Sequence, residues 1–275
     1  MALTTITVRK LAELAHTAPS ADNSQPWRLS WDGETLAIAY DTERVSGKTF
    51  PADSPATLLS IGAVVENIIT VATDWDLQPQ LEYREKLPST EGEYARIHFL
   101  GSDQDNAKIG TDHCVSRRHC NRRKYTKTLV PITVSKALIT LREGASRTLF
   151  IEEKSVIQRI ASMVQLASEI RFQTREVHEW LGKSLRFSSR TANRGDGMDI
   201  ATLALPPGGG LFLRLVSDWH RMRILNRLGI YKVLSAIDSA PIKSAPGLIA
   251  VIGGTDALET INAGRVMGRT WTLMN

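Results

Sequence analysis

The 275-residue sequence has two cysteines, Cys114 and Cys120, which are too few for a scaffold held together by disulfides. It has no apolar run that approaches the roughly 18 residues needed to cross a bilayer. Its N-terminus lacks the basic stretch, apolar core and small-residue cleavage site of a signal peptide. These absences predict a reduced, cytoplasmic protein with no membrane anchor and no membrane partner.

Apolar residues make up 42% and charged residues 23% of the chain, which is close to the average for globular proteins. This mixture excludes a disordered, collagen-like or coiled-coil chain. The net charge of +5 is concentrated in one dense basic cluster between Arg117 and Lys124. A cluster of this size suits a phosphate group better than a long duplex, which usually needs an extended basic stripe. We therefore expect no nucleic-acid partner.

Hydrophobic periodicity and turn signals predict the elements of the first half of the chain. Asp32–Gly33 is a strong hairpin signal between two strands. Ser54 is a helix N-cap followed by Pro55 at the first helical position, and the helix after it is apolar on more than one face. The predicted elements are a helix over 8–16, strands over Trp27–Trp31 and Thr35–Tyr40, a helix over 54–75, and strands over 77–83 and 94–100.

A polar segment over 101–111 predicts a boundary between two halves, residues 1–110 and 111–275. In the second half we expect helices over 131–143, 155–174, 211–228 and 257–274, another helix through Trp180, and strands over 148–152 and 247–253. Residues 188–210 are rich in Gly, Ser and Pro. A connection of that length predicts a mobile lid.

A faint internal repeat relates the two halves. Residues 62–72 can be aligned with residues 264–274, so that Gly62, Val64 and Thr70 coincide with Gly264, Val266 and Thr272. Such a repeat predicts two halves of the same topology that pack face to face, each with a buried helix at their interface.

The most informative string is Ala18-Pro-Ser-Ala-Asp-Asn-Ser-Gln-Pro-Trp27. Its amide side chains each offer a donor and an acceptor, which suits a planar heterocycle with carbonyl and N–H edges. The alternative is an ordinary helix-to-strand loop whose Asn and Ser side chains bond their own backbone.

The pattern Pro-Ser-x-x-Asn-x-Gln-Pro-Trp resembles the flavin-contacting loop of the nitroreductase family. The basic segment over 117–125 is similar to the segment with which that family binds the phosphate of FMN. Ordinary members carry the basic segment ahead of the loop, whereas here it follows. That order, together with Gly-Ala-x-x-Glu-Asn in the first half, resembles a fused branch in which one chain mimics the usual homodimer.

The resemblance implies an α+β, nitroreductase-like fold of two similar halves, each with a mostly antiparallel sheet and buried central helices. It implies one FMN site between the halves, in a monomeric pseudo-dimer or a homodimer. The isoalloxazine would be lined by Pro19, Ser20, Ala21, Asn23 and Gln25, and the phosphate and ribityl end would be held by Arg117, Arg118, Asn121 and Arg123.

The implied activity is an FMN-dependent NAD(P)H oxidoreductase that passes hydride to a nitroaromatic, quinone or similar small-molecule acceptor. The flavin carries this chemistry, so no side chain is expected to act as a catalytic acid or base. One alternative is a flavin-sequestering protein with little or no reductase activity, which the lid and Asp22 favour. Another is a basic interaction module for an acidic partner or nucleic acid.

Two departures from the family pattern bear on flavin binding. Asp22 places a carboxylate in the loop, where it would disfavour an anionic reduced flavin if it faced the ring. The sequence ends at Asn275 with the second Gly-initiated helix, so it looks truncated relative to the family.

His113-Cys114 and His119-Cys120 offer ligand types that suit zinc, but their spacing is not a standard pattern and the neighbouring arginines oppose a cation. We therefore expect no metal. The Gly-rich stretch over 206–210 lacks the Lys-Ser/Thr of a P-loop, so it does not predict phosphate binding.

Overall fold

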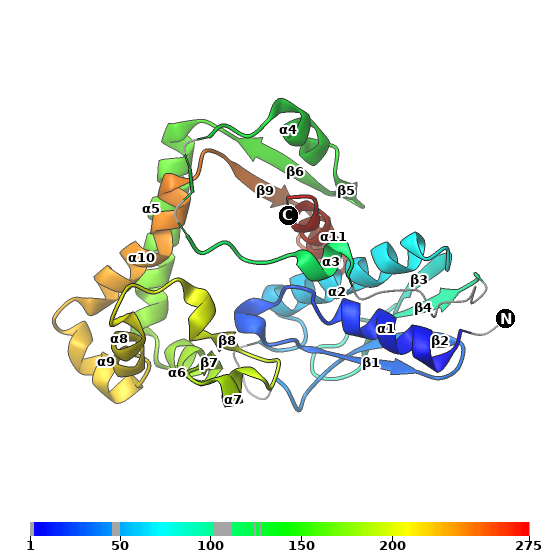
Figure 1. Cartoon of the computed structure of the whole chain (residues 1–275), viewed down its shortest axis with the longest axis horizontal. Helices are drawn as coiled ribbons and strands as arrows, with labels where there is room; N and C mark the ends of the chain where they lie inside the picture. Colours follow the sequence, from blue (N-terminus) through cyan, green and yellow to red (C-terminus); the bar gives the residue numbers. More distant parts are fainter. Residues whose placement is uncertain (1–2, 46–49, 102–111, 124, 127, 275) are drawn as a thin grey trace. The chain divides into compact units, whose positions relative to one another are not determined.

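The computed structural model describes residues 3–45, 50–101, 112–123, 125–126 and 128–274. The fold is of the α+β class, with helices and mostly antiparallel sheets (Figure 1). The chain forms two compact units. Unit 1 comprises Met1–His119, Leu138–Thr148 and Val251–Asn275, and unit 2 comprises Cys120–Ala137 and Leu149–Ala250.

The two units interleave along the chain, whereas the sequence predicts two consecutive halves. Unit 1 takes in the end of the chain as well as its beginning. Residues 102–111 of the predicted linker lie outside the described residues. The division into two similar halves remains a prediction.

Unit 1 is built on a four-stranded sheet of β1 (Trp27–Trp31), β2 (Thr35–Tyr40), β3 (Pro79–Tyr83) and β4 (Glu93–Phe99). The strand order is β1-β2-β4-β3 and every pair is antiparallel. The predicted hairpin is confirmed, with Trp27 opposite Tyr40. All six residues of β2 are buried, as expected of a strand with a neighbour on each side.

Asp32 fixes the turn of this hairpin. Its carboxylate accepts hydrogen bonds from the backbone N–H of Glu34 (2.9 Å), and from the backbone N–H (2.8 Å) and hydroxyl (2.6 Å) of Thr35. These bonds favour the ionised carboxylate, so they hold the pKa of Asp32 well below its usual value, the hydroxyl of Thr35 contributing most. Gly33 supplies the left-handed backbone that the turn requires (φ +107°).

Two capped helices belong to the same unit. α1 (Thr5–Ala15) begins at Thr4 and α2 (Pro55–Asp74) begins at Ser54, each capped by a hydroxyl that accepts a backbone N–H. Contrary to the expectation from apolar runs, α2 is long and apolar enough to cross a membrane. Of its most apolar stretch, however, 72% is buried inside the protein, which is the pattern of a core helix.

The repeat predicted from Gly62 and Gly264 corresponds to a helix crossing. α11 (Ala257–Leu273) packs against α2. A Cβ placed on Gly62 would collide with Ile261 O and lie 2.8 Å from Gly264 Cα, and one on Gly264 would collide with Leu59 O. Only glycine permits this backbone contact, so the close packing of the two helices explains why both positions are glycine.

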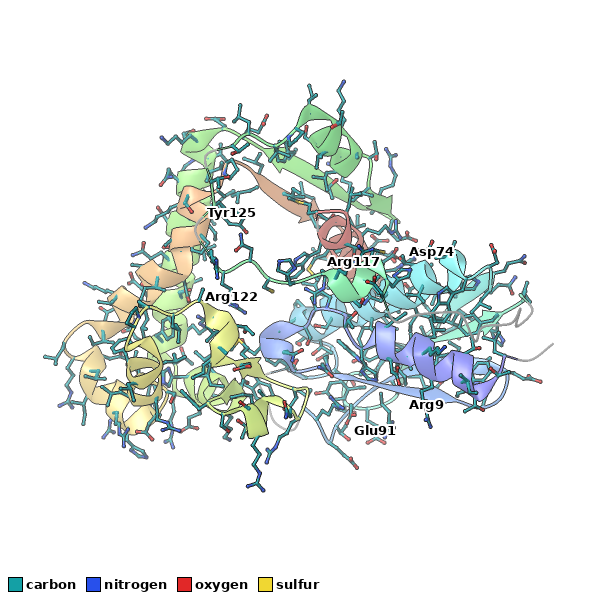
Figure 2. The ribbon with its side chains drawn as sticks, in the orientation of Figure 1. Arg9, Asp74, Glu91, Arg117, Arg122 and Tyr125 are labelled. Carbon is teal, nitrogen blue, oxygen red and sulfur yellow. The ribbon has the colours of Figure 1, made fainter. Side chains whose placement is uncertain are left out.

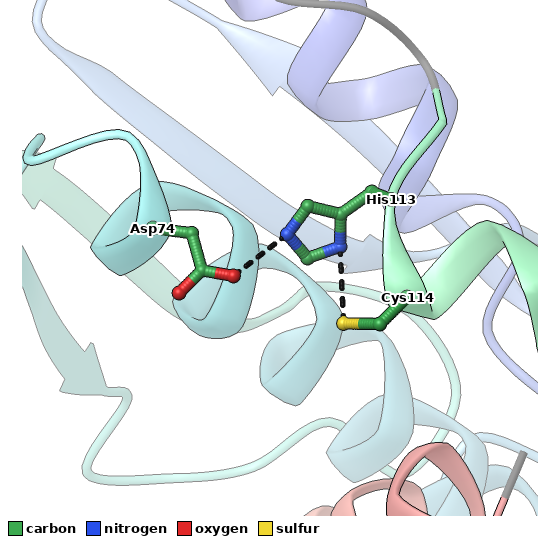
Figure 3. Close-up of side chains that lie close together, drawn as sticks. All are labelled: Asp74, His113 and Cys114. Carbon is green, nitrogen blue, oxygen red and sulfur yellow. Dashed lines mark hydrogen bonds and ion pairs between the residues drawn. The ribbon is translucent and has the colours of Figure 1, made fainter.

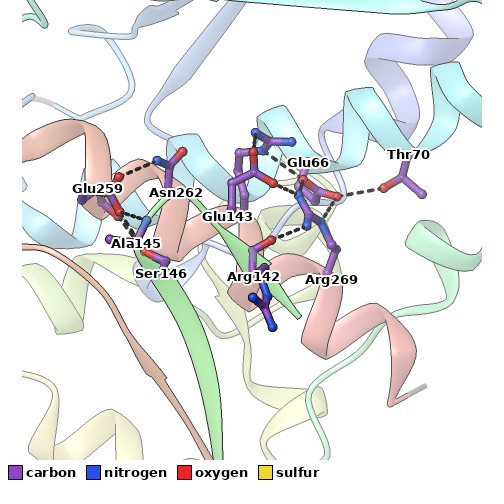
Figure 4. Close-up of polar contacts among 10 residues, drawn as sticks. Glu66, Thr70, Arg142, Glu143, Ala145, Ser146, Glu259, Asn262 and Arg269 are labelled. Atoms are coloured by element: carbon purple, nitrogen blue, oxygen red, sulfur yellow. Dashed lines mark hydrogen bonds and ion pairs between the residues drawn. The ribbon is translucent and has the colours of Figure 1, made fainter. Parts of the chain in front are cut away.

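A buried ion-pair network joins α2 to α11 and to β5 (Arg142–Glu143), as Figure 4 shows. Glu66 is 5% exposed and accepts hydrogen bonds from Arg265 Nε (3.0 Å) and from Arg269 Nε (2.5 Å) and Nη2 (2.9 Å). Glu143 accepts from Arg265 Nη1 (2.6 Å) and Arg269 Nη2 (2.5 Å). Two carboxylates and two guanidiniums therefore satisfy one another. Their bonds raise the pKa of Arg269 above its usual value.

The segment over 131–143 is not one helix. α4 (Ile132–Ile139) ends early because Arg142 and Glu143 pair as β5 with β6 (Ser146–Ile151), around a turn at Gly144. β5 and β6 form a three-stranded sheet with β9 (Leu248–Ile252). The predicted strands over 148–152 and 247–253 are thus confirmed within one or two residues.

Unit 2 contains α5 (Lys154–Gln173), α6 (Arg175–Ser184), α8 (Gly209–Val216), α9 (Trp219–Asn226) and α10 (Ile230–Ser244). The predicted helix over 211–228 is wrong as a single element, because Asp218 starts a new helix by accepting the N–H of Arg221 (3.0 Å). α10, which contains Pro241, has no counterpart among the helices predicted from the sequence.

Residues 188–210, which the sequence predicts to be a mobile lid, include regular secondary structure. They contain α7 (Ser189–Ala192), β8 (Met198–Asp199) and a short 3-10 helix, η3 (Ile200–Leu203). β8 pairs in parallel with β7 (Leu185–Arg186). Arg186 also binds Asp196, with 3.0 Å between Nη2 and Oδ2. Side-chain caps and one ion pair stabilise these short elements, and the role of the segment as a mobile lid stays a prediction.

Candidate functional site

The polar loop (residues 18–26) is a tight coil in unit 1 between α1 and β1. Ser20 organises it: Ser20 O accepts Asn23 N–H (3.1 Å), and Ser20 Oγ accepts Gln25 N–H (3.0 Å). Asp22, Asn23 and Gln25 all adopt left-handed backbone conformations, with φ of 51°, 55° and 48°. Three such residues within four positions cost conformational energy, and strain of this kind clusters at ligand-binding segments.

The two amide side chains predicted to contact the flavin bind each other. Gln25 is buried, and its Nε2 donates to Asn23 Oδ1 (3.2 Å). Its Oε1 accepts from Arg44 Nη1 (2.9 Å). Gln25 therefore holds the loop in shape, whereas residues 20–24 are partly exposed to solvent.

His16 and Trp27 close the base of the loop. Trp27 Nε1 donates to His16 Nδ1 (3.0 Å), and their ring centroids are 6.3 Å apart. Burial, and next the positive charge of Arg44, lower the pKa of His16. A neutral imidazole is what this bond needs, because Nδ1 must accept.

Thr17 joins the polar loop to the start of the basic segment (residues 117–125). Its hydroxyl donates to Leu14 O (2.7 Å) and also lies 3.2 Å from Val115 O in α3 (Cys114–Arg117), and it accepts from Asn67 Nδ2 (3.3 Å). Its carbonyl oxygen accepts from Arg118 Nη2 (2.9 Å). Two motifs that lie about a hundred residues apart in sequence are thus side by side in unit 1.

α11 contacts the start of the basic segment through the side chain of Trp271. The Arg118 guanidinium lies over the Trp271 ring, with Cζ 4.6 Å from the ring centroid, and Trp271 Nε1 donates to His119 O (3.3 Å). Arg118 is therefore held by a carbonyl group and an aromatic face, which is the stacked geometry that arginine favours.

Arg117 points to solvent at the end of α3 (Figure 2). Its side chain is 70% exposed, and the side chain of its ion partner Asp112, at 3.5 Å, is 85% exposed. An ion pair this exposed contributes little, so a phosphate could displace it.

The structure places seven of the nine predicted flavin-contacting residues in unit 1 and the other two, Asn121 and Arg123, in unit 2. Asn121 and Arg123 are exposed, and Asn121 Oδ1 accepts Arg123 N–H (3.0 Å). The seven in unit 1 are Pro19, Ser20, Ala21, Asn23, Gln25, Arg117 and Arg118.

The chemistry of these groups suits FMN in two respects. Exposed guanidinium groups match phosphate oxygens, and a loop with strained backbone offers N–H and C=O groups for a flavin edge. The loop side chains suit it less, since Gln25 is buried and engaged with Arg44. A separate depression of about 480 Å³ in unit 2 is lined by residues of the 188–210 segment and by none of the nine.

Sequence reasoning missed three residues of the site: Thr17, Arg44 and Trp271. Thr17 directly precedes the motif and carries an ordinary hydroxyl, and Arg44 lies in a charged turn. Nothing in their local sequence distinguishes them, because their partners come from distant segments.

No protein-family model matches this chain. The chain is 24% identical over 266 residues to an uncharacterized protein of Mycobacterium tuberculosis (strain CDC 1551 / Oshkosh), MT1398. The match covers 95% of this chain and 36% of that protein. The chain thus spans about a third of the length of the curated relative that it matches, and the relative's name gives no activity.

Proposed function

We propose that the chain binds FMN at the polar loop and the basic segment and acts as a nitroreductase-like NAD(P)H oxidoreductase of the cytoplasm. Bound FMN would supply hydride transfer from NAD(P)H to a small acceptor such as a nitroaromatic or quinone. The observation that carries the proposal is the hydrogen bond from Arg118 to Thr17 O, which joins the two motifs in unit 1.

The roles of the chain's own residues follow from their surroundings. Arg117, which is exposed, would pair with the phosphate. Arg118 would hold the basic segment against the loop, since Thr17 and Trp271 occupy its guanidinium. Gln25 and Arg44 would keep the loop backbone in shape for the isoalloxazine.

The crossing of α2 and α11 supports the prediction that the fold consists of two similar halves fused in one chain. The glycines that coincide in the sequence repeat, Gly62 and Gly264, meet at this crossing. A twofold-related pair of helices in a homodimer would place equivalent residues opposite each other in the same way. This supports a pseudo-dimer within one chain.

The test is the absorbance spectrum of the purified chain after incubation with FMN and desalting, with an Arg117→Ala variant beside it. Wild type should keep a flavin spectrum. Arg117→Ala should bind FMN about tenfold or more weakly, because a hydrogen bond to a charged group contributes about 1.5–3 kcal/mol. The matched control is Arg175→Ala, which removes another exposed arginine, at the start of α6, and should change nothing.

Loss of flavin from wild type, or equal losses in both variants, would contradict the proposed site. A flavin-loaded protein that does not oxidise NADH or NADPH would instead be a flavin-sequestering protein. A colourless protein that binds acidic polymers in a strongly salt-dependent way would indicate the basic interaction module.

A further inference from the structure

Three side chains of unit 1 form a connected group that the proposed flavin site does not use (Figure 3). Cys114 Sγ lies 3.4 Å from His113 Nδ1, and His113 Nε2 lies 2.9 Å from Asp74 Oδ2. The carboxylate comes from the end of α2, and the imidazole and thiol come from the start of α3.

The hydrogen bonds to the two ring nitrogens of His113 determine which nitrogen carries the proton in the neutral imidazole. His113 Nδ1 accepts the backbone N–H of Val115 (3.3 Å), so in the neutral ring the proton is on Nε2 and points to Asp74. The one lone pair of Nδ1 therefore faces both the Val115 N–H (3.3 Å) and the thiol (3.4 Å), and Nδ1 takes the thiol proton when it gives up the long bond to Val115. A thiol, an imidazole that can take its proton and a carboxylate that orients the imidazole form the arrangement that activates cysteine nucleophiles.

We propose that Cys114 is a reactive thiol that forms mixed disulfides with low-molecular-weight disulfides, with His113 as its base and Asp74 as the residue that orients the base. The thiol proton passes to His113 Nδ1, and the thiolate attacks one sulfur of the disulfide. The new S–S bond forms as the old one breaks. The departing thiolate takes the proton from His113, so the protein thiol is oxidised and the disulfide is reduced.

A metal ion fits the same three residues less well. Asp74 and Cys114 contact different nitrogens of the His113 ring. The lone pairs of those nitrogens point apart, so a single ion reaches only one of them. The arrangement therefore favours proton transfer along the ring over shared coordination.

Cys120 provides a control within the same chain. It is exposed, whereas Cys114 is partly buried. Accessibility alone would make Cys120 react faster, and the proposal requires the opposite order. Neither this order nor its test depends on whether the chain binds FMN.

The experiment measures the rate at which oxidised glutathione forms a mixed disulfide at each cysteine at neutral pH, by peptide mass mapping. We expect Cys114 to react about tenfold or more faster than Cys120, since a positioned base contributes about that factor or more. His113→Asn keeps a side chain that caps a helix well but is no base, and it should slow Cys114 to the rate of Cys120. Asp74→Asn should slow Cys114 severalfold.

The circular dichroism spectrum reports whether each variant is folded, and the rate at the exposed Cys120 reports whether the reagent is equally active in each experiment. Equal rates at the two cysteines of wild type would overturn the proposal, as would a His113→Asn variant whose Cys114 is as fast as wild type. If Cys114 reacts only after a chelator is added, the group holds a metal and the proposal is wrong.

Discussion

Gly62 of α2 and Gly264 of α11 meet where the two helices cross, with 2.8 Å between the position of a Cβ on Gly62 and Gly264 Cα. The backbone itself is the packing surface there, so a side chain at either position must push the helices apart. The sequence repeat that aligns these two glycines therefore has a physical counterpart.

Gly62→Ala and Gly264→Ala should each lower the free energy of unfolding by about 1–3 kcal/mol or more through overpacking. Urea denaturation measures the change. Gly268→Ala is the matched control on the same helix, because its Cβ would lie 3.6 Å from Ala63 Cα, an ordinary contact. That variant should be neutral or slightly stabilising, since alanine is the better helix former. Equal effects at all three positions would argue against the close crossing.

Glu66→Gln should lower the free energy of unfolding by about 3–5 kcal/mol. The substitution removes the negative charge that pairs with the guanidinium groups of Arg265 and Arg269 in a buried network. Thermal and urea unfolding both report this loss. Glu179→Gln makes the same chemical change in an exposed pair with Arg175 and should have a much smaller effect, because water screens that pair. A Glu66 variant as stable as the Glu179 variant would show that the network contributes little.

His178 should make the folded state sensitive to acid. It is 2% exposed, its Nε2 lies 2.8 Å from Val216 O, and no hydrogen-bond partner is found for Nδ1 among the described residues. Burial lowers the pKa of His178 below its ordinary value of 6.5. The unfolded chain therefore binds the proton first, and stability falls as the pH drops below about 6.5, by at most about 1.4 kcal/mol per pH unit for this one proton.

The free energy of unfolding, measured between pH 7.5 and 5, checks this expectation. His178→Gln keeps an N–H donor for Val216 O but does not titrate, so its stability should fall less over that range than that of wild type. The pKa of His16 is also lowered, and it contributes equally to both proteins, so the difference between them isolates His178. Parallel curves for the two proteins would contradict the assignment.

Asp22→Asn should tighten FMN binding if the proposed flavin site is correct. It removes a negative charge from the loop, and two unit charges about 4 Å apart that are fully screened by water interact with about 1 kcal/mol, or roughly fivefold in affinity. Titration of flavin fluorescence measures the change. Glu43→Gln removes an exposed carboxylate from the turn after β2 and should leave the affinity within about twofold of wild type. An unchanged affinity in Asp22→Asn would place its carboxylate away from the flavin.

Elements with strong local signals could be predicted from the sequence. The hairpin at Asp32–Gly33, the helix capped by Ser54 and the final helix all appear within one or two residues of their expected bounds. In each, the turn or cap residues are neighbours in sequence, so the local pattern carries the needed information. The break at Asp218 also has a local signal, because Asp218 is an N-cap residue inside the apolar run over 211–228.

The candidate site could be predicted only in part. The polar loop and basic segment were recognised, but Thr17, Arg44 and Trp271 were not, since each acts through a residue far away in sequence. The group of Asp74, His113 and Cys114 was likewise missed as a unit, because Asp74 ends a helix almost forty residues before His113.

The sequence by itself determined where chain segments turn, start and stop, because those choices depend on neighbouring backbone groups. It also placed Gly62 and Gly264 in equivalent positions. Only the tertiary structure decided that α11 packs on α2, that the four charges of the buried network neutralise one another, and that an imidazole joins a thiol to a carboxylate. Those outcomes depend on distances between residues far apart in the chain, which are set when apolar surfaces pack and buried charges must find partners.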